Sequence, residues 1–312
     1  MELVHATPFV IELKNASKIY RSFPGRSVTA VEEFSLQIAE GEVLGIAGPN
    51  GAGKSTLLSL LLGYLRPTGG SVLINGMAPR SFVEKNGIGY LSELMTINAN
   101  WKARDALTRF ATLAAVPRAN VPGRVNAVME ELGITEHQDK KIKALSKGNL
   151  QRLGVAQALL RDEQVLILDE PTHGLDPVWT QRFRSIIEGL RKPNRTIIIA
   201  SHNLDELQRL ADRVAIIDRG RLQRLVQTGY DQATDAGGTY RISVVGGAPH
   251  VKEMFPAALA TGEGEFELSF SSIIELNAAI AKLIGGGVLV SGVVPARSVL
   301  EQQFREAVGE TS

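Results

Sequence analysis

The chain has 312 residues, of which 44% are hydrophobic and 21% charged, and its formal net charge at pH 7 is +1. This length suits one large domain or two ordinary ones, and the composition is that of a globular protein. The near-neutral charge argues against a nucleic-acid-binding surface, and the absence of cysteine excludes disulfides and thiolate metal sites. No apolar run approaches the roughly 18 to 20 residues of a membrane-spanning helix, so we expect any membrane contact to come through a partner.

The first part of the chain, residues 9–46, is predicted to be rich in β-structure. Short strand-like runs occur at 9–13 and 33–38, and Gly41 marks a turn before a continuously apolar run at 43–47. Tyr20 lies between the first two runs. Its ring could stack on a nucleotide base, although a single tyrosine is more often part of a half-buried surface.

A glycine-rich segment follows the apolar run and precedes a predicted helix at 56–62. It fits the pattern G-x-x-x-x-G-K-[ST] and consists of Gly48, Pro49, Asn50, Gly51, Ala52, Gly53, Lys54, Ser55 and Thr56. The glycines allow several N–H groups to point into one concavity, and a helix beginning near Gly53 adds its positive end, so the loop can hold phosphate oxygens. Lys54 would contact the β- and γ-phosphates, and the Ser55 hydroxyl can bind Mg²⁺. The strand before it and the helix after it make a merely structural turn a poor alternative.

A helical block is predicted after two further short strands at 72–74 and 88–91. Apolar residues recur at three- and four-residue spacings in 101–114 and 121–132. We expect these helices, within about 94–160, to be an insertion into an α/β domain.

Two continuously apolar strands at 165–168 and 196–200 end in polar residues. Asp169 and Glu170 follow the first strand, and His202 lies just after the second. Ligand-binding residues of parallel sheets lie at the carboxyl ends of the strands. Asp169 can hold Mg²⁺ and Glu170 can polarise an attacking water, although an acidic pair here could also be only a helix cap or a solvated turn.

The residue pattern of the sequence changes again beyond about residue 222. Glycine-rich stretches indicate a linker at 226–238. Strands are then predicted at 240–244, 266–270 and 288–294, with helices at 272–283 and 298–308. Residues 239–312 are therefore predicted to form a small α+β accessory domain.

Together these segments resemble the ATP-binding subunit of ABC transporters over about residues 9–225. Leu145 to Asn149 is similar to the signature loop of that family and is followed at once by a predicted helix at 150–160. Residues 165–170 resemble its second acidic motif, Gly174 to Asp176 its D-loop, and His202 its switch histidine. Tyr20 lies where the family has its base-stacking aromatic residue.

The resemblance implies a P-loop NTPase fold of the ABC ATPase type over residues 1–225. Such a fold has a β-rich first subdomain, a mainly parallel core sheet and an inserted helical subdomain. It also implies ATP and Mg²⁺ as cofactors, with Lys54, Glu170 and His202 in catalysis and Ser55, Glu93 and Asp169 at the metal. Two such domains pair head to tail, so that Ser146, Lys147, Gly148 and Asp176 would act at the ATP of the partner, which is a second copy or a homologous ATPase subunit.

Three positions depart from the family pattern. Glu93 stands where most members have glutamine, Lys147 replaces a glycine of the signature, and Asn149 replaces a glutamine. Glu93 can still hold Mg²⁺ or contact a membrane subunit, but it adds negative charge beside the phosphates. Because the residues needed for hydrolysis are present, we expect an active ATPase.

The subclass is indicated by Glu93, Lys147 and the tail segment 295–304. These resemble the ATPases of bacterial exporters whose transmembrane permease subunit is of the ABC-2 type. The likeness implies a peripheral protein at the cytoplasmic face of the inner membrane. The sequence of this chain does not identify the transported substrate.

Two other functions were weighed against transport. An ABC ATPase that acts on ribosomes or DNA usually carries two cassettes or a long coiled coil, whereas this chain has one glycine loop and no sustained heptads. A nucleotide kinase or GTPase would leave the 145–149 loop and His202 unexplained.

Overall fold

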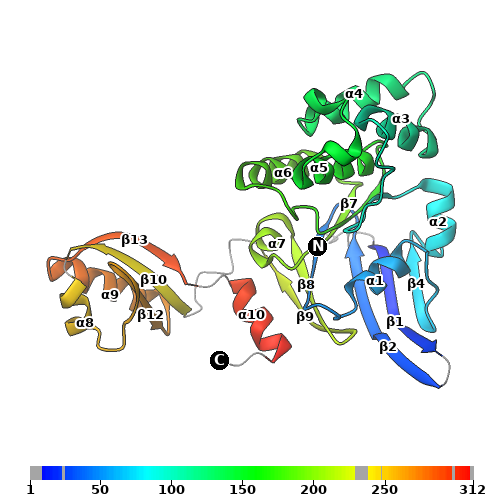
Figure 1. Cartoon of the computed structure of the whole chain (residues 1–312). Coiled ribbons are helices and arrows are strands. Elements are labelled where there is room, and N and C mark those ends of the chain that lie inside the picture. Colours follow the sequence, from blue (N-terminus) through cyan, green and yellow to red (C-terminus); the bar gives the residue numbers. More distant parts are fainter. Residues whose placement is uncertain (1–8, 23–24, 229–237, 247, 297–298, 310–312) are drawn as a thin grey trace, which may run out of the picture. The chain divides into compact units, whose positions relative to one another are not determined.

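The protein is shown as a computed structural model in Figure 1, which describes residues 9–22, 25–228, 238–246, 248–296 and 299–309. The chain divides into two compact units: the first comprises the chain up to Gln227 together with a short segment that begins at Ala307, and the second runs from Thr228 to Glu306. The predicted linker at 226–238 falls at this division. Its residues 229–237 lie outside the described part of the chain.

The first unit is built on a mostly parallel six-stranded sheet with strand order β5-β6-β7-β3-β8-β9. Only the pairing of β8 with β9 is antiparallel. Strands β3, β6 and β7 are buried at every residue, as expected for strands covered on both faces. The strands are β3 (Val43–Ala47), β5 (Gly89–Leu91), β6 (Val165–Asp169), β7 (Thr196–Ala200), β8 (Arg213–Asp218) and β9 (Arg221–Gln227).

A three-stranded antiparallel sheet precedes the core sheet in the chain. It consists of β1 (Phe9–Ser22), β2 (Arg26–Ala39) and β4 (Gly69–Ile74), in the order β2-β1-β4. β1 and β2 form a hairpin much longer than the runs predicted at 9–13 and 33–38. The register of β1 and β2 shifts several times along the hairpin, and these shifts break the apolar alternation from which strands are recognised. The first subdomain is β-rich, as predicted.

Helices surround the core sheet and form the inserted block. α1 (Lys54–Leu61) contacts β2 and β4, and α7 (Leu204–Leu210) contacts β3, whereas α3 packs on both α4 and α5. α2, α6 and α7 were not among the predicted elements. The remaining bounds are α2 (Pro79–Asn86), α3 (Ala103–Leu113), α4 (Val121–Glu131), η1 (Thr135–His137), η2 (Ile142–Ala144), α5 (Lys147–Ala158) and α6 (Pro177–Leu190).

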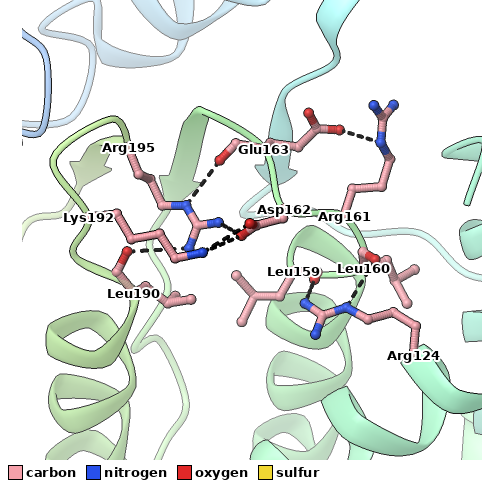
Figure 2. A network of polar contacts seen from close by, with 9 residues as sticks. All are labelled: Arg124, Leu159, Leu160, Arg161, Asp162, Glu163, Leu190, Lys192 and Arg195. Atoms are coloured by element: carbon pink, nitrogen blue, oxygen red, sulfur yellow. Dashed lines mark hydrogen bonds and ion pairs between the residues drawn. The ribbon is translucent and has the colours of Figure 1, made fainter.

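Ion pairs fasten the loop that leads into β6 (Figure 2). The Arg195 side chain is almost fully buried and donates to the carbonyl oxygens of Glu163 and Leu190, at 3.0 and 3.3 Å, and to the Asp162 carboxylate. Lys192 Nζ lies 2.9 Å from both oxygens of Asp162. Nearby, Arg124 donates to carbonyl oxygens at the end of α5, which are unpaired within the helix. These contacts hold the amino ends of β6 and β7 together.

The second unit contains a four-stranded antiparallel sheet with strand order β11-β12-β10-β13. Its elements follow one another as β-α-β-β-α-β, which is a ferredoxin-like arrangement. Ile242, Phe266, Leu276 and Leu283 belong to its own hydrophobic core. The bounds are β10 (Gly238–Val245), α8 (Ala248–Met254), β11 (Leu259–Gly262), β12 (Glu265–Phe270), α9 (Ile273–Gly285) and β13 (Leu289–Pro295).

The prediction of a small α+β domain is thus confirmed in its class. α8 and β11 were not predicted, because α8 is short and all four residues of β11 are exposed, which leaves no alternation to recognise. The final helix α10 runs from Val299 to Val308, and Ser298 of the predicted helix lies outside the described residues. Among the described residues, no helix is long and apolar enough to cross a membrane.

Candidate functional site

The glycine-rich segment forms a tight loop between β3 and α1. Gly51 and Gly53 have φ angles of 82° and 106°, in the left-handed region that favours glycine. A Cβ atom on Gly48 would overlap the carbonyl oxygen of Ile217, and one on Gly53 would overlap that of Ala30. The cradle therefore exists because the backbone approaches more closely than any side chain would allow.

The turn between β8 and β9 supports this loop from outside. Gly220 N donates to Ala52 O at 2.8 Å, and Glu32 N donates to Gly220 O at 2.9 Å. A Cβ on Gly220 would lie 2.8 Å from Ala30 O. Sequence reasoning missed Gly220, because a single glycine in a turn between two strands carries no specific signal.

Lys54 and Tyr20 both lie at the glycine loop. Lys54 is the first residue of α1, and its Nζ donates to Gly48 O at 2.6 Å and to Pro49 O at 3.2 Å. The Tyr20 hydroxyl lies 3.5 Å from Thr56 Oγ1, and the residue is 42% exposed. An exposed ring beside a phosphate cradle favours the base-stacking interpretation of Tyr20 over half-buried packing.

The carboxyl end of β6 brings Asp169 next to the glycine loop. Asp169 is buried, and burial together with repulsion from Glu93 and Glu170 raises the pKa of its carboxyl to about 6, against the opposing effect of Lys54. These four charged groups come from three separate chain segments, because Asp169 and Glu170 are adjacent. Their mutual influence shows that the fold gathers them at one edge of the sheet.

Glu170 is held in place from the neighbouring strand β7. Its Oε2 accepts from Ser201 Oγ at 3.1 Å, its Oε1 accepts from His202 N at 2.9 Å, and His202 Nδ1 lies 2.8 Å from Oε1. Glu170 has a φ of 49°, an unusual conformation for a residue with a side chain. Such conformations persist where the surroundings fix them and are common at active sites.

Two residues that support Glu170 were missed by sequence reasoning. Ser201 donates to its carboxylate, and Gln151 Nε2 donates to the carbonyl oxygens of Glu170 and Pro171 at 2.9 and 3.0 Å. Ser201 could have been found because it ends the strand next to β6. Nothing in the sequence around Gln151 shows that it faces Glu170, since the two are 19 positions apart.

A second loop with an anion-binding character begins α5. The helix starts at Lys147, three residues before the predicted start, with Ser146 as its N-cap; Ser146 Oγ accepts from Asn149 N at 3.2 Å. Ser146 and Lys147 are exposed, and a Cβ on Gly148 would lie 3.2 Å from Gly174 O. The signature loop therefore lies against the segment that leads to Asp176, which is also exposed and caps α6.

The residues present fit ATP with Mg²⁺. The glycine cradle offers backbone N–H groups to phosphate, and Ser55, Glu93 and Asp169 offer oxygen donors of the kind Mg²⁺ prefers. In the described part of the chain no three His, Cys, Asp or Glu side chains converge on a metal. Magnesium is usually held by one or two carboxylates, with phosphate and water as its remaining ligands. Bound there, the ion would offset the negative charge of the phosphates.

Comparison with known proteins identifies the family. The family profile described as ABC transporter matches residues 31–173. An uncharacterized ABC transporter ATP-binding protein of Nostoc sp. (strain PCC 7120) is 33% identical over 305 residues, which cover 96% of this chain and 89% of that protein. The chain belongs to the ABC transporter ATP-binding proteins. Another such ATP-binding protein, YhcH of Bacillus subtilis, is 32% identical over 97% of both chains.

Solved structures agree with this ABC ATPase in fold. The ATP-binding cassette MJ0796, in a dimeric post-hydrolysis state bound to ADP and Pi, superposes with a TM-score of 0.65 over 70% of this chain and 99% of its own, at 21% identity. The cbiO1 protein of Clostridium perfringens, part of the transporter complex cbiONQ, has a TM-score of 0.59 at 28% identity, over 70% of this chain and 89% of its own. The predicted ABC ATPase fold is confirmed, and the protein is an ATPase that serves as the ATP-binding subunit of an ABC transporter.

Proposed function

We propose that this ABC ATPase powers an exporter, by ATP-driven pairing of two ATPase subunits that move a separate transmembrane permease of the ABC-2 type. The pairing partner is a second copy or a homologous subunit. The protein would lie peripherally at the cytoplasmic face of the inner membrane and touch the membrane only through the permease. ATP and Mg²⁺ would be its cofactors.

One observation supports the pairing of two ATPase subunits. The first unit has two helix starts suited to phosphate, at Gly53 and at Ser146, and they belong to different parts of the fold. The glycine loop packs on Ala30, Ile217 and Gly220, whereas Gly148 packs on Gly174 and Leu175. Backbone N–H groups and the helix dipole make each start a site for anions. Two copies arranged head to tail would place one start of each kind on every ATP.

Within that arrangement the residues divide the work. Lys54 and the loop N–H groups of residues 48–56 bind the phosphates, Tyr20 supports the base, and Ser55, Asp169 and Glu93 hold the metal. Glu170, oriented by Ser201 and His202, takes a proton from the attacking water. His202 steadies the γ-phosphate, while Ser146, Lys147, Gly148 and Asp176 act from the partner.

Export is supported by the sequence rather than by the names of relatives. Glu93, Lys147 and the 295–304 segment resemble the exporter subclass. A relative from Bacillus licheniformis, named bacitracin transport ATP-binding protein BcrA, is 36% identical over 68% of both chains. A methionine import ATP-binding protein, MetN of Haemophilus ducreyi, is 32% identical over 86% of this chain and 77% of its own. The names of relatives therefore include both directions.

The experiment that tests the proposal has two arms. With the ATPase alone in dilute solution, ATP hydrolysis should rise with the square of protein concentration, and turnover of the free ATPase that is strictly linear in protein concentration at every dilution would contradict pairing. With the ATPase reconstituted with its cognate permease in proteoliposomes, ATP added on the ATPase side should drive substrate away from that side. Substrate movement toward the ATPase side would contradict export but leave pairing intact.

A further inference from the structure

We propose that Trp179 is a positioning residue that couples the signature serine to the D-loop aspartate of the same chain. The inference rests on the proposed function, because it assigns to Ser146 and Asp176 a joint task at the partner's ATP. Trp179 lies in the first turn of α6, three residues after Asp176. It has no place in the catalytic set derived above.

The Trp179 ring carries two guanidinium groups. The Cζ atom of Arg152, from α5, lies 3.9 Å from the ring centroid, and that of Arg182, from α6, lies 4.6 Å away. Cations attract the face of an indole ring more strongly than that of any other side chain. Arg152 Nε is buried with no hydrogen-bond partner, and burial lowers the pKa of Arg152 below its usual range. The ring face therefore compensates for the partial desolvation of this guanidinium.

The same stack is tied to the end of α4. Arg152 Nη1 donates to Gly133 O at 3.1 Å, and Arg182 Nη2 donates to Glu131 O at 3.2 Å. A Cβ atom on Gly133 would overlap the indole ring, so the backbone packs directly on Trp179. Three helices thus meet at one side chain, so we expect a change in its size to disturb the packing of α5 against α6.

A continuous series of contacts runs from Ser146, at the start of α5, to Asp176, at the start of α6. Ser146 Oγ accepts from Asn149 N, and Asn149 Oδ1 accepts from Arg152, which stacks on Trp179. Trp179 N donates to Asp176 Oδ1 at 2.9 Å. The hydrogen bonds at the two ends use the backbone N–H groups of Asn149 and Trp179, so the part of the series that depends on the Trp179 side chain is its stack with Arg152, which joins α6 to α5. Preorganised groups of this kind lose their effect when displaced by as little as about 1 Å.

The chain offers a matched control in its other tryptophan. Arg109 lies over the Trp101 ring, with Cζ 4.6 Å from the centroid. This stack joins the segment before α3 to α3 itself and includes neither the signature loop nor the D-loop. Trp101→Leu removes the same kind of interaction without touching the series from Ser146 to Asp176.

The test measures ATP-driven dimerisation of the full-length protein by sedimentation, in a Glu170→Gln background with Mg²⁺ and ATP. Trp179→Leu should raise the dimer dissociation constant at least about tenfold, whereas Trp179→Phe, which keeps a ring, should stay within about threefold. ATP affinity of the monomer should remain within about twofold of the parent, because residues 48–56 and Tyr20 are unchanged. Trp101→Leu should dimerise like the parent.

A double variant separates positioning from general loss of stability. If Trp179 acts through Ser146, then Ser146→Ala combined with Trp179→Leu should weaken the dimer little more than the stronger single change. Fully additive effects would overturn the coupling. If Trp179→Leu does not fold, Arg182→Met, which keeps the ring but removes one cation, should still weaken the dimer about threefold, and an unchanged dimer would overturn the inference.

The two ideas fail in different ways. A dimer weakened by Ser146→Ala but not by Trp179→Leu would leave the shared ATP site standing and remove the role of Trp179. A dimer unaffected by Ser146→Ala would remove the shared site itself, and the coupling with it.

Discussion

The two loops of this ABC ATPase that we propose to bind phosphate differ in what surrounds them. The Gly53 loop lies at the edge of the core sheet, where the fold also brings Lys54, Asp169 and Glu170 within electrostatic reach of one another. The Ser146 loop is exposed, and its close neighbours are Gly174 and Leu175.

Because of this difference, one chain is expected to supply only part of the chemistry. In the proposed function the first loop combines a phosphate cradle with a metal site and a general base, so we expect a single copy to bind ATP. The second loop offers an exposed, capped helix start, and we expect it to act only when another molecule brings an ATP to it. The predictions below separate the two loops.

The largest effect is expected at the first loop. Lys54→Ala removes the charge that contacts the phosphates, and loss of one preorganised contact of this kind costs about 2.7 to 4 kcal/mol at the transition state, or roughly 10²- to 10³-fold in turnover. Steady-state ATP hydrolysis checks this. Replacing the exposed Lys140 by alanine should leave the rate unchanged, and a Lys54→Ala protein with parental turnover would contradict the role of the loop.

Glu170→Gln should strongly impair catalysis while keeping ATP binding. The amide cannot accept the proton of the attacking water, and general-base catalysis typically contributes 10²- to 10⁴-fold, so turnover should fall at least about 100-fold. The variant should accumulate as an ATP-bound dimer, visible by sedimentation. Hydrolysis at the parent rate would remove Glu170 from the catalytic set.

Ser146→Ala should affect only the second loop. The change removes the N-cap of α5, which costs about 1 kcal/mol, and one contact to the partner's phosphate, so we expect a roughly tenfold loss of turnover. ATP binding to the monomer, followed with a fluorescent analogue, should not change. Ser146→Thr keeps the hydroxyl and should recover most of the activity, whereas weaker monomer binding in Ser146→Ala would mean that the two loops are not separate.

The smallest effect is expected far from both loops. The Lys192 ammonium, and then Arg195, hold the pKa of Asp162 below its usual value of about 3.9. The ionised carboxylate therefore stabilises the fold above that value, and this contribution is lost as pH falls through the lower folded pKa. Because Asp162 is largely exposed, Asp162→Asn should lower the free energy of unfolding at pH 7 by less than about 1 kcal/mol.

Urea unfolding at pH 7 and below pH 4 checks this last expectation. The difference between parent and Asp162→Asn should shrink at the lower pH, and ATP turnover of folded protein at pH 7 should be unchanged. A difference that grew on acidification would contradict the assigned cause. Lys192→Met should show the same pH trend, because it removes the other half of the pair.

Some features of this protein follow from the sequence because they are local. The continuously apolar runs that became β3, β6 and β7 could be recognised because both faces of these strands are buried. The phosphate loop could be recognised because positions 48, 51 and 53 require glycine, either for a close backbone contact or for a positive φ angle. The family resemblance then supplied the α/β class and the ATPase activity.

Other features depend on contacts between residues far apart in the chain. The raised pKa of Asp169, the support of Glu170 by Ser201 and Gln151, and the approach of Gly220 to the loop exist only once strands and helices have packed. The strand order of the second unit and the stack on Trp179 are of the same kind. Local sequence determined which groups this protein has for its chemistry, and tertiary packing decided which of them meet, because burial and short distances arise only from the folded chain.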